Sequence, residues 1–238
     1  MSRAEHAGDV RLDALGLTLA GVINTFLAAA VAILVVGPGS IPGESDPVVR
    51  AEWIAEHETR WQAGWLFWFA VTLSFAWSYF ALGRHLRAAR PWVAMAIGVA
   101  LVAAAVDVVG VVVNIAVVPE LAGMVSGGGA SESSGFRGFE NLAYALVNVA
   151  AFGLYSLAGL LLLPAAFATT SYPRWLCWLG VAEWSVAALA TALLVVAPDA
   201  ADGPLFVSFA LYAPWVWGSA AWLMRGSRGD LASADAGA

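Results

Sequence analysis

Apolar residues dominate six stretches of the chain, and each stretch is long enough to cross a lipid bilayer. The hydrocarbon core is about 30 Å thick and takes roughly 20 helical residues to cross. Because backbone amides in lipid must be paired within their own segment, each stretch is predicted to be a helix. The predicted spans are Leu15–Val36, Trp61–Leu82, Trp92–Val118, Leu142–Ala168, Trp175–Ala197 and Leu205–Met224. The pattern therefore predicts an all-α fold, a polytopic transmembrane bundle of six helices.

The polar segments around these stretches divide the chain into three parts. Residues 1–14 are predicted to be a cytoplasmic N-terminal segment and not a cleavable signal peptide, because they are polar and mixed in charge. Residues 15–224 form the transmembrane domain. Residues 225–238 are small and polar, which predicts a disordered cytoplasmic tail. Residues 126–138 are rich in Gly and Ser, which predicts a flexible loop.

The first predicted outer loop carries a helix signal of its own. Asp46 precedes Pro47, the order expected for an N-cap followed by a proline in the first turn. A helix of about three turns is predicted from Pro47 to Arg60. Its apolar face would hold Val49, Trp53 and Ile54. We expect a short amphipathic helix on the outer membrane surface, with this face toward the lipid.

The positions of the arginines predict the orientation in the membrane. All 11 basic residues are arginines, and basic residues near spans favour the cytoplasmic side. With the N-terminus inside, the cytoplasmic segments hold Arg3, Arg11, Arg84, Arg87, Arg90, Arg174, Arg225 and Arg228, whereas the outer loops hold only Arg50, Arg60 and Arg137. We therefore predict a multi-pass protein of the bacterial cytoplasmic (inner) membrane, with both termini in the cytoplasm.

The composition agrees with a membrane protein and argues against several functions. Apolar residues make up 61% of the 238 residues and charged residues 12%, against about 45–50% and about 25% in soluble domains. The net charge is −6 and no basic tract occurs, so no nucleic-acid partner is predicted. Cys177 is the one cysteine, which excludes an internal disulfide. Recognisable catalytic or metal-binding motifs do not occur, so no catalytic residue, cofactor or metal is predicted, and a non-enzymatic protein is favoured.

Two acids and three amides interrupt the apolar stretches, and these residues are the candidate site. Embedded ionisable residues are costly in a bilayer and are functional candidates by default. The set is Asn24, Asp107, Asn114, Asn148 and Glu183, together with Tyr144 and Tyr155, which share a helical face with Asn148. Small residues share the faces of these side chains, which is typical of sides where helices pack closely. We expect Asp107 and Glu183 to face inward, largely protonated, and Asp107 to meet the amide of Asn148.

The polar set supports several interpretations. The side chains would hold helices in register, or they would line a pathway for a ligand, proton or ion. The leading hypothesis is a protein that binds a lipid or small amphiphile in a bundle cavity, or an accessory subunit of a larger membrane complex. The alternatives are a small proton-coupled transporter that uses Asp107 or Glu183, and a lipid-modifying membrane enzyme. Membrane lipids are the expected partners, and a homo-oligomer is compatible with the sequence.

Three motifs resemble a known protein family. They are DPVVRAEWIAEHETRWQAGWL after the first span, ALGRHLRAARPWVAMA between the second and third, and TTSYPRWLCWLGVAEW at the start of the fifth. The chain resembles a bacterial family of six-span membrane proteins of similar length, whose domain has no known function. Cys177 departs from the pattern, because a small residue such as Gly is expected there. The resemblance implies the six-span fold and no activity or site residue.

Overall fold

The structure is a computed structural model that describes residues 3–31, 46–86, 89–128 and 133–235. Within these ranges every regular element is a helix, as the pattern predicts. Three long helices each contain a π-helical turn: α1 (Arg3–Val22), η1 (Ile23–Leu27) and α2 (Ala28–Val31); α5 (Arg90–Val112), η5 (Val113–Val117) and α6 (Val118–Ser126); α7 (Ser133–Tyr144), η7 (Ala145–Ala151) and α8 (Phe152–Ala168). The remaining elements are α3 (Pro47–Glu56), α4 (Glu58–His85), α9 (Arg174–Val196), the 3₁₀ turn η8 (Pro198–Ala200) and α10 (Asp202–Asp235).

Five helices are long and apolar enough to cross a membrane, which supports a membrane protein. They are Gly8–Val31, Glu58–His85, Arg90–Ser126, Ser133–Ala168 and Arg174–Val196. Each overlaps one of the first five predicted spans. The sixth predicted span, Leu205–Met224, lies within α10, which is not among the five. The predicted count of six crossings is therefore not confirmed by length and hydropathy.

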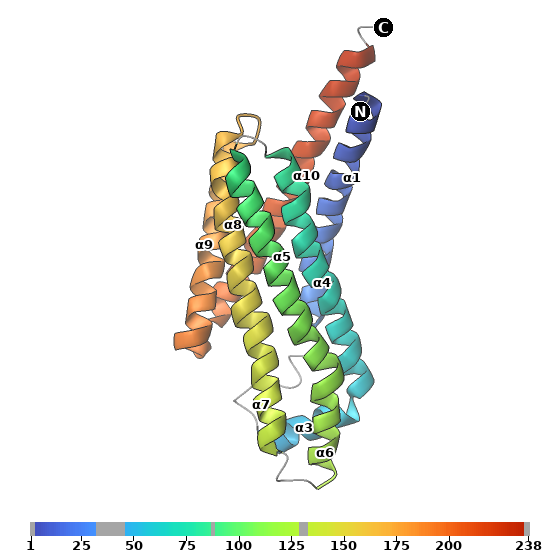
Figure 1. The fold of residues 1–238 in the computed structure, drawn as a ribbon, viewed down its shortest axis with the longest axis vertical. Helices are drawn as coiled ribbons and strands as arrows, with labels where there is room; N and C mark the ends of the chain where they lie inside the picture. The colour runs from blue at the N-terminus through green and yellow to red at the C-terminus, as the bar shows by residue number, and fades with distance from the viewer. Residues whose placement is uncertain (1–2, 32–45, 87–88, 129–132, 236–238) are drawn as a thin grey trace.

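The long helices form a closed ring in which each packs on its neighbours. Going round the ring, α1 contacts α4, α4 contacts α5, α5 contacts α8, α8 contacts α9, α9 contacts α10, and α10 returns to α1. Both termini lie at one end of this bundle (Figure 1). Large apolar side chains on the outside of the ring are exposed, among them Phe26, Leu66, Leu101 and Trp178. The outside of the bundle therefore presents apolar side chains, as expected for a protein in lipid.

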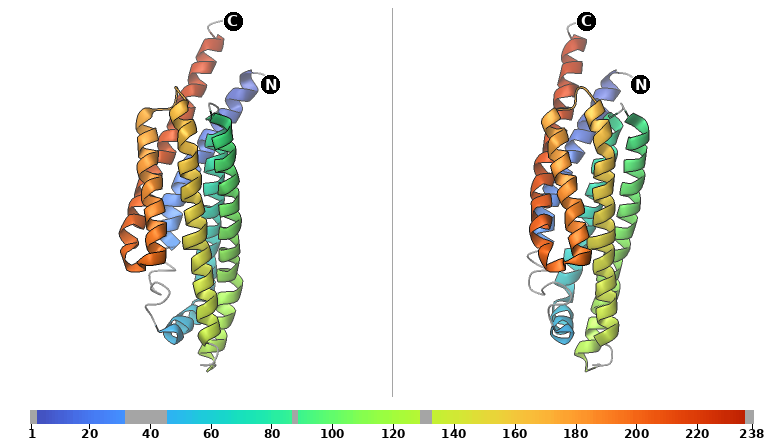
Figure 2. Two further views of the ribbon diagram at one scale, coloured as in Figure 1. Left: turned by 60° about the vertical axis from the view of Figure 1, so that its left-hand side comes forward. Right: turned by 90° about the vertical axis from the view of Figure 1, so that its left-hand side faces the viewer.

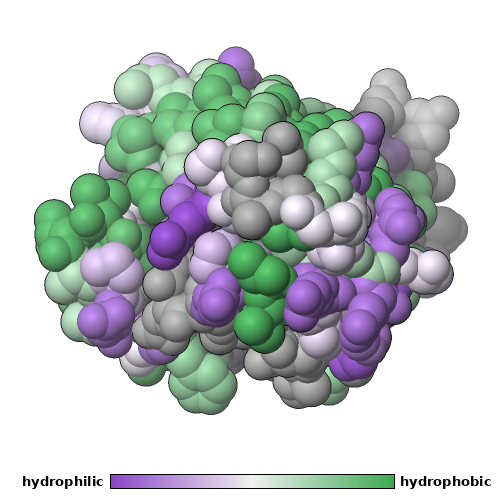
Figure 3. Space-filling view, turned by 90° about the horizontal axis from the view of Figure 1, so that it is seen from below, coloured by the Kyte–Doolittle hydropathy of each residue, from purple (hydrophilic) through white to green (hydrophobic). Residues whose placement is uncertain are grey.

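Two neighbouring helices extend past α9 and α10 at the end opposite the termini, and this creates a step. Arg90–Ser126 has 37 residues and Ser133–Ala168 has 36, against 23 in α9. At 1.5 Å per residue the difference is about 20 Å. The α6 and α7 segments consequently extend beyond the ends of α9 and α10, and α3 lies across them (Figures 1 and 2). Seen from this end, hydrophilic side chains gather on the end face and apolar ones cover one side (Figure 3).

The loop helix forms where it was predicted, but its surroundings differ. The Asp46 side chain accepts a hydrogen bond from the Val48 amide at 2.9 Å, so the predicted N-cap is confirmed. The helix ends at Glu56, not at Arg60, and α4 begins two residues later. Its buried face holds Arg50, Ala51 and Ile54, whereas Val49 is 58% exposed. Of the predicted apolar face, Ile54 packs against protein and Trp53 is partly buried, because α3 contacts α6 and α7.

Helices also extend into the predicted flexible loop, residues 126–138, and into the predicted disordered tail, residues 225–238. The α7 helix begins at Ser133, inside the predicted flexible loop, whose residues 129–132 lie outside the described ranges. The α10 helix continues to Asp235, through most of the predicted disordered tail. At the other end α1 begins at Arg3. Once a helix is nucleated, each further residue adds a hydrogen bond at low cost, so polar residues of moderate propensity prolong it.

Candidate functional site

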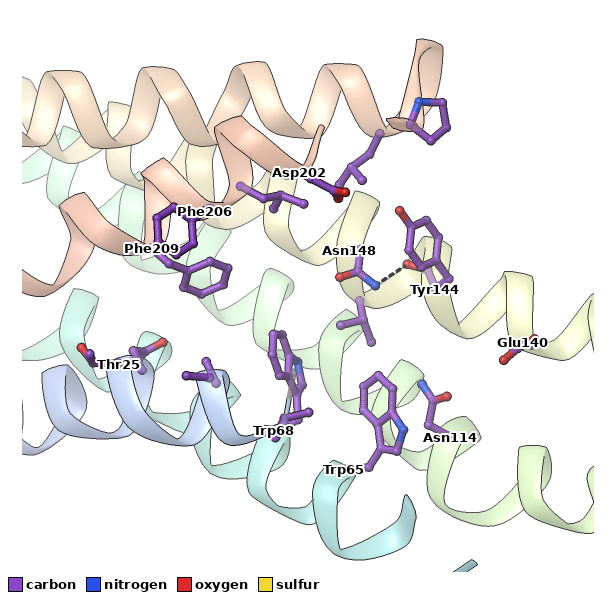
Figure 4. Close-up of a pocket in the computed structure, with 18 of the residues that line it drawn as sticks. Thr25, Trp65, Trp68, Asn114, Glu140, Tyr144, Asn148, Asp202, Phe206 and Phe209 are labelled. Atoms are coloured by element: carbon purple, nitrogen blue, oxygen red, sulfur yellow. Dashed lines mark hydrogen bonds between the residues drawn. The ribbon is translucent and has the colours of Figure 1, made fainter. Parts of the chain in front are cut away.

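A cavity of about 580 Å³ opens at the step between the long and short helices. Its walls come from the η1 and α2 end of the first helix, from α4 and η5, from α7 and η7, and from the facing ends of α9 and α10 (Figure 4). Most of the lining is apolar or aromatic, including Trp61, Trp65, Trp68, Phe206 and Phe209. The volume falls within the range of about 300–1,000 Å³ that is usual for small-molecule pockets.

Each of the three embedded asparagines lies in a π-helical turn, and all three line this cavity. Asn24 is in η1, Asn114 in η5 and Asn148 in η7. In each turn the amide nitrogen donates to the carbonyl four residues earlier: Ala20 at 2.9 Å, Gly110 at 3.1 Å and Tyr144 at 3.4 Å. The side chain thus bonds the carbonyl that an α-helix would give to the backbone N–H. Such π-turns occur frequently at functional sites.

Side chains of α4 bond the backbone of one of these turns from outside the helix. The indole N–H of Trp61 donates to the carbonyl of Asn114 at 2.7 Å, and the amide of Gln62 donates to the carbonyl of Ile115 at 3.3 Å. Since exposed backbone groups are costly in a bilayer, these two bonds stabilise the η5 turn where it meets the cavity. The geometry of the turn is therefore set by tertiary contacts as well as by Asn114.

The end of the cavity near α3 carries a buried ion pair. The Arg50 guanidinium of α3 donates to the Glu140 carboxylate of α7, and its side chain also lies over the ring of Trp61. The two side chains are only 4% and 6% exposed. Arg50 was predicted to lie in an outer loop, Glu140 precedes the predicted fourth span, and the pair between them was not predicted. The available signal was spacing, because Arg50 shares a helical face with Ile54, and Glu140 shares one with Phe136 and Ala143.

Among the described residues, three side chains of the lining have a buried polar atom without a hydrogen-bond partner. These atoms are Asn24 Oδ1, Thr25 Oγ1 and Trp65 Nε1. A buried donor or acceptor left unpaired costs about 1–3 kcal/mol, so such groups are rare in native interiors. The three atoms are enclosed by the surrounding protein and are not exposed to the cavity.

Asp107 is buried as predicted, but its partners are not those predicted. The carboxylate accepts hydrogen bonds from the Thr72 hydroxyl at 2.7 Å and from the Trp68 indole at 3.2 Å, both on α4. The expected contact with the Asn148 amide was wrong, because that amide bonds within its own helix. Asp107 does not line the cavity, although Trp68 does. It therefore joins α5 to α4 beneath the cavity wall.

Glu183 belongs to a separate polar layer between α9, α10 and α4. Its Oε1 accepts from the Ser208 hydroxyl at 3.0 Å, and Oε2 is buried without a partner. Nearby, the Tyr212 hydroxyl donates to Ser78, and the Tyr79 hydroxyl donates to the carbonyl of Tyr155 at 2.6 Å. Glu183 does not line the cavity either. The seven predicted site residues thus divide, with Asn24, Asn114, Tyr144 and Asn148 at the cavity and Asp107, Tyr155 and Glu183 in the packed interior.

The described part of the chain has no cluster of three or more His, Cys, Asp or Glu side chains that could hold a metal ion. His57, beside the acids of the loop helix, bonds the carbonyl of Trp53 at 2.9 Å and stacks on its ring. His85 bonds Asp13 at 2.8 Å and so links α4 to α1 near the termini. These histidines are engaged in joining helices or in stacking.

Comparison with known proteins gives a family and no activity. A family described as a domain of unknown function, DUF4386, matches residues 16–226, which is most of the chain. The chain therefore belongs to this family. No curated protein and no solved structure matches the chain at a significant level.

Proposed function

We propose that this DUF4386 protein binds a small amphiphile in the cavity at the step of the helix bundle. The observation that carries the proposal is a cavity whose lining is mostly apolar or aromatic and also holds polar side chains, among them Tyr144, Asn148 and Asp202. An apolar lining favours a molecule with a hydrocarbon body. The polar side chains of the lining favour one that also carries hydrogen-bonding groups.

The position of the cavity supports a ligand that comes from the membrane. The cavity opens within the bundle whose outer surface is apolar, and helices from both sides of the step contribute to its walls. Neither Asp107 nor Glu183 reaches it, so the arrangement favours binding over transport coupled to either acid. No cofactor is part of the proposal.

We further propose six crossings with both termini in the cytoplasm. The α10 helix packs against α1 and α9 along the ring, and both termini lie at one end of the bundle (Figure 1). An even number of crossings is the arrangement compatible with this placement. Arg84, Arg90, Arg174 and Arg225 all belong to segments at that end, which favours the cytoplasmic side.

Photo-crosslinking tests the binding proposal. The probe is dodecanol with a diazirine in mid-chain, added to the full-length protein in mild detergent, and labelled residues are found by mass spectrometry of peptides. We expect labelling of cavity residues such as Trp68 and Phe209 that saturates and is displaced by unlabelled dodecanol. Labelling confined to lipid-facing residues such as Phe26 or Trp178, without displacement, would contradict the proposal.

A matched pair of variants separates the cavity from the general lipid surface. Ala29 lines the cavity and is exposed, so Ala29→Phe should fill part of the cavity without a clash in the core. Ala105 is equally exposed on α5 but lies outside the cavity. We expect Ala29→Phe to reduce saturable labelling at least about fivefold, and Ala105→Phe to leave it unchanged. Equal effects of the two variants would show that the probe binds elsewhere.

A further inference from the structure

The charged groups of the cavity lining are unequal in number, and this specifies the charge of the ligand. Among the described residues that line the cavity, Arg50 is the one cation, and Glu140 and Asp202 are the two anions. Given that the cavity binds an amphiphile, as proposed above, we propose that its ligand is a cationic amphiphile. Its protonated amine would lie beside Asp202, and its hydrocarbon body along the face of α10 that follows.

Asp202 is the charge of the lining that has no counter-charge nearby. The Arg50 guanidinium is bonded to the Glu140 carboxylate in a buried pair. Within the described ranges, no arginine or histidine nitrogen lies within 4.0 Å of the Asp202 carboxylate. Asp202 lies in the first turn of α10, whose amides carry only about half a positive charge. The lining therefore keeps a net negative charge at the start of α10.

An anionic head group would meet unfavourable charges at both places in the cavity that it could occupy. Beside Asp202 it would be repelled by a like charge. Beside Arg50 it would have to displace Glu140 from a buried pair, which is unfavourable. A cationic head group meets neither obstacle, because Asp202 is available to it.

The side chains around Asp202 offer hydrogen-bond acceptors to a head group. Asp202 is exposed, and Tyr144 and Asn148 are half-buried, so all three can be reached from the cavity that they line. The Asp202 carboxylate is close enough to act electrostatically on the Tyr144 hydroxyl, and Asn148 lies on the same side of the cavity (Figure 4). The Asn148 nitrogen is bonded to the Tyr144 carbonyl at 3.4 Å, and its Oδ1 can accept. A protonated amine, which only donates, matches a carboxylate and an amide oxygen.

The face of α10 that begins at Asp202 becomes apolar within one turn. Leu205, Phe206 and Phe209 follow Asp202 by three, four and seven residues and line the cavity with it, which is the spacing of one helical face. Phe209 is about 10 Å from Asp202 along the helix axis. Trp68 adds its ring to the lining from α4 (Figure 4). A charged head at Asp202 thus leads directly to a site for a hydrocarbon chain.

Competition for the photoprobe site tests the charge of the ligand. The competitors are dodecylamine, dodecanol and dodecanesulfonate, compared on the full-length protein at pH 7 and at equal mole fraction in uncharged micelles. The amine is protonated there, since an alkylammonium group loses its proton at about pH 10. We expect dodecylamine to displace the probe at about a three- to fivefold lower mole fraction than dodecanol, the range of an exposed ion pair. Dodecanesulfonate should be weaker than dodecanol.

A matched pair of variants tests whether Asp202 carries this preference. Asp202→Asn removes the charge and keeps the size of the side chain, so it should bring dodecylamine to the potency of dodecanol. Asp199→Asn removes the same charge from an exposed position in η8, outside the cavity, and should keep the full preference. Thermal unfolding of each variant shows whether it is folded, and the competition on the unmodified protein tests the ligand charge without either variant.

The outcomes separate this inference from the proposed function. Saturable labelling that dodecylamine and dodecanol displace equally, or that dodecanesulfonate displaces best, would overturn the cationic ligand and leave the binding proposal intact. A preference for dodecylamine that survives Asp202→Asn, or that Asp199→Asn removes as well, would overturn the assignment to Asp202. Absence of saturable labelling would overturn both proposals.

Discussion

Replacing Glu140 by leucine is expected to destabilise the protein by about 3–5 kcal/mol. The change removes the carboxylate partner of Arg50, whose side chain is only 4% exposed. Breaking a buried ion pair from one side is strongly destabilising because the remaining charge loses a close counter-charge in a low-dielectric interior. Reversible unfolding in mixed micelles, followed by circular dichroism, measures the free energy.

The double variant Arg50→Met with Glu140→Leu tests whether the loss of stability comes from the charge that remains. Replacing both members of a buried pair by apolar residues is often neutral or stabilising, so the double variant should recover most of the loss. Asp9→Asn is the control, because the Arg84–Asp9 pair spans 3.8 Å with side chains 40% and 45% exposed. Exposed pairs contribute at most about 1 kcal/mol. If Glu140→Leu lowered the free energy of unfolding no more than Asp9→Asn, the buried ion pair between α3 and α7 would be contradicted.

Replacing Gly159 by alanine is expected to cost about 3 kcal/mol, the upper part of the usual range for overpacking a core. A Cβ at this position would overlap the indole of Trp184. That ring has little room to move, since it is 1% exposed and lies against Tyr79, Tyr212 and Trp215 with centroids 5.6, 6.0 and 5.5 Å away. The same unfolding measurement gives the free-energy change.

Gly98 supplies the matched control for this prediction. It lies in α5, another long helix, and a Cβ there would meet no atom within 4 Å. Gly98→Ala should therefore be neutral or stabilising by up to about 1 kcal/mol through helix propensity. Opposite signs for the two substitutions would support the close packing of α8 on α9. A similar small gain for both would contradict it.

The fold class and the inward direction of the polar set follow from the sequence. An apolar run of about 20 residues can only be a helix in lipid, and Asp107, Asn114, Asn24 and Glu183 are all buried, as their small-residue faces predict. The partners of these side chains could not be predicted in the same way. A π-turn inserts an extra residue and rotates the following face, so Asn148 does not point where a regular helix would place it.

The cavity itself depends on features that a span prediction does not contain. It forms because Arg90–Ser126 and Ser133–Ala168 continue well past the bilayer-length core, and because α3 folds back between them. The burial of Arg50 and Glu140 was therefore not predicted, although the helices that carry them bury both side chains. Only the spacing of these residues relative to Ile54, Phe136 and Ala143 carried the information.

An experimental structure of the protein in a lipid nanodisc tests the central claim most directly, namely that the step of the bundle encloses a binding cavity. The account predicts elongated density inside the cavity, in contact with Trp68 and Phe209. A step that is closed by side chains, with no room for a ligand beside Trp68 and Phe209, would contradict it.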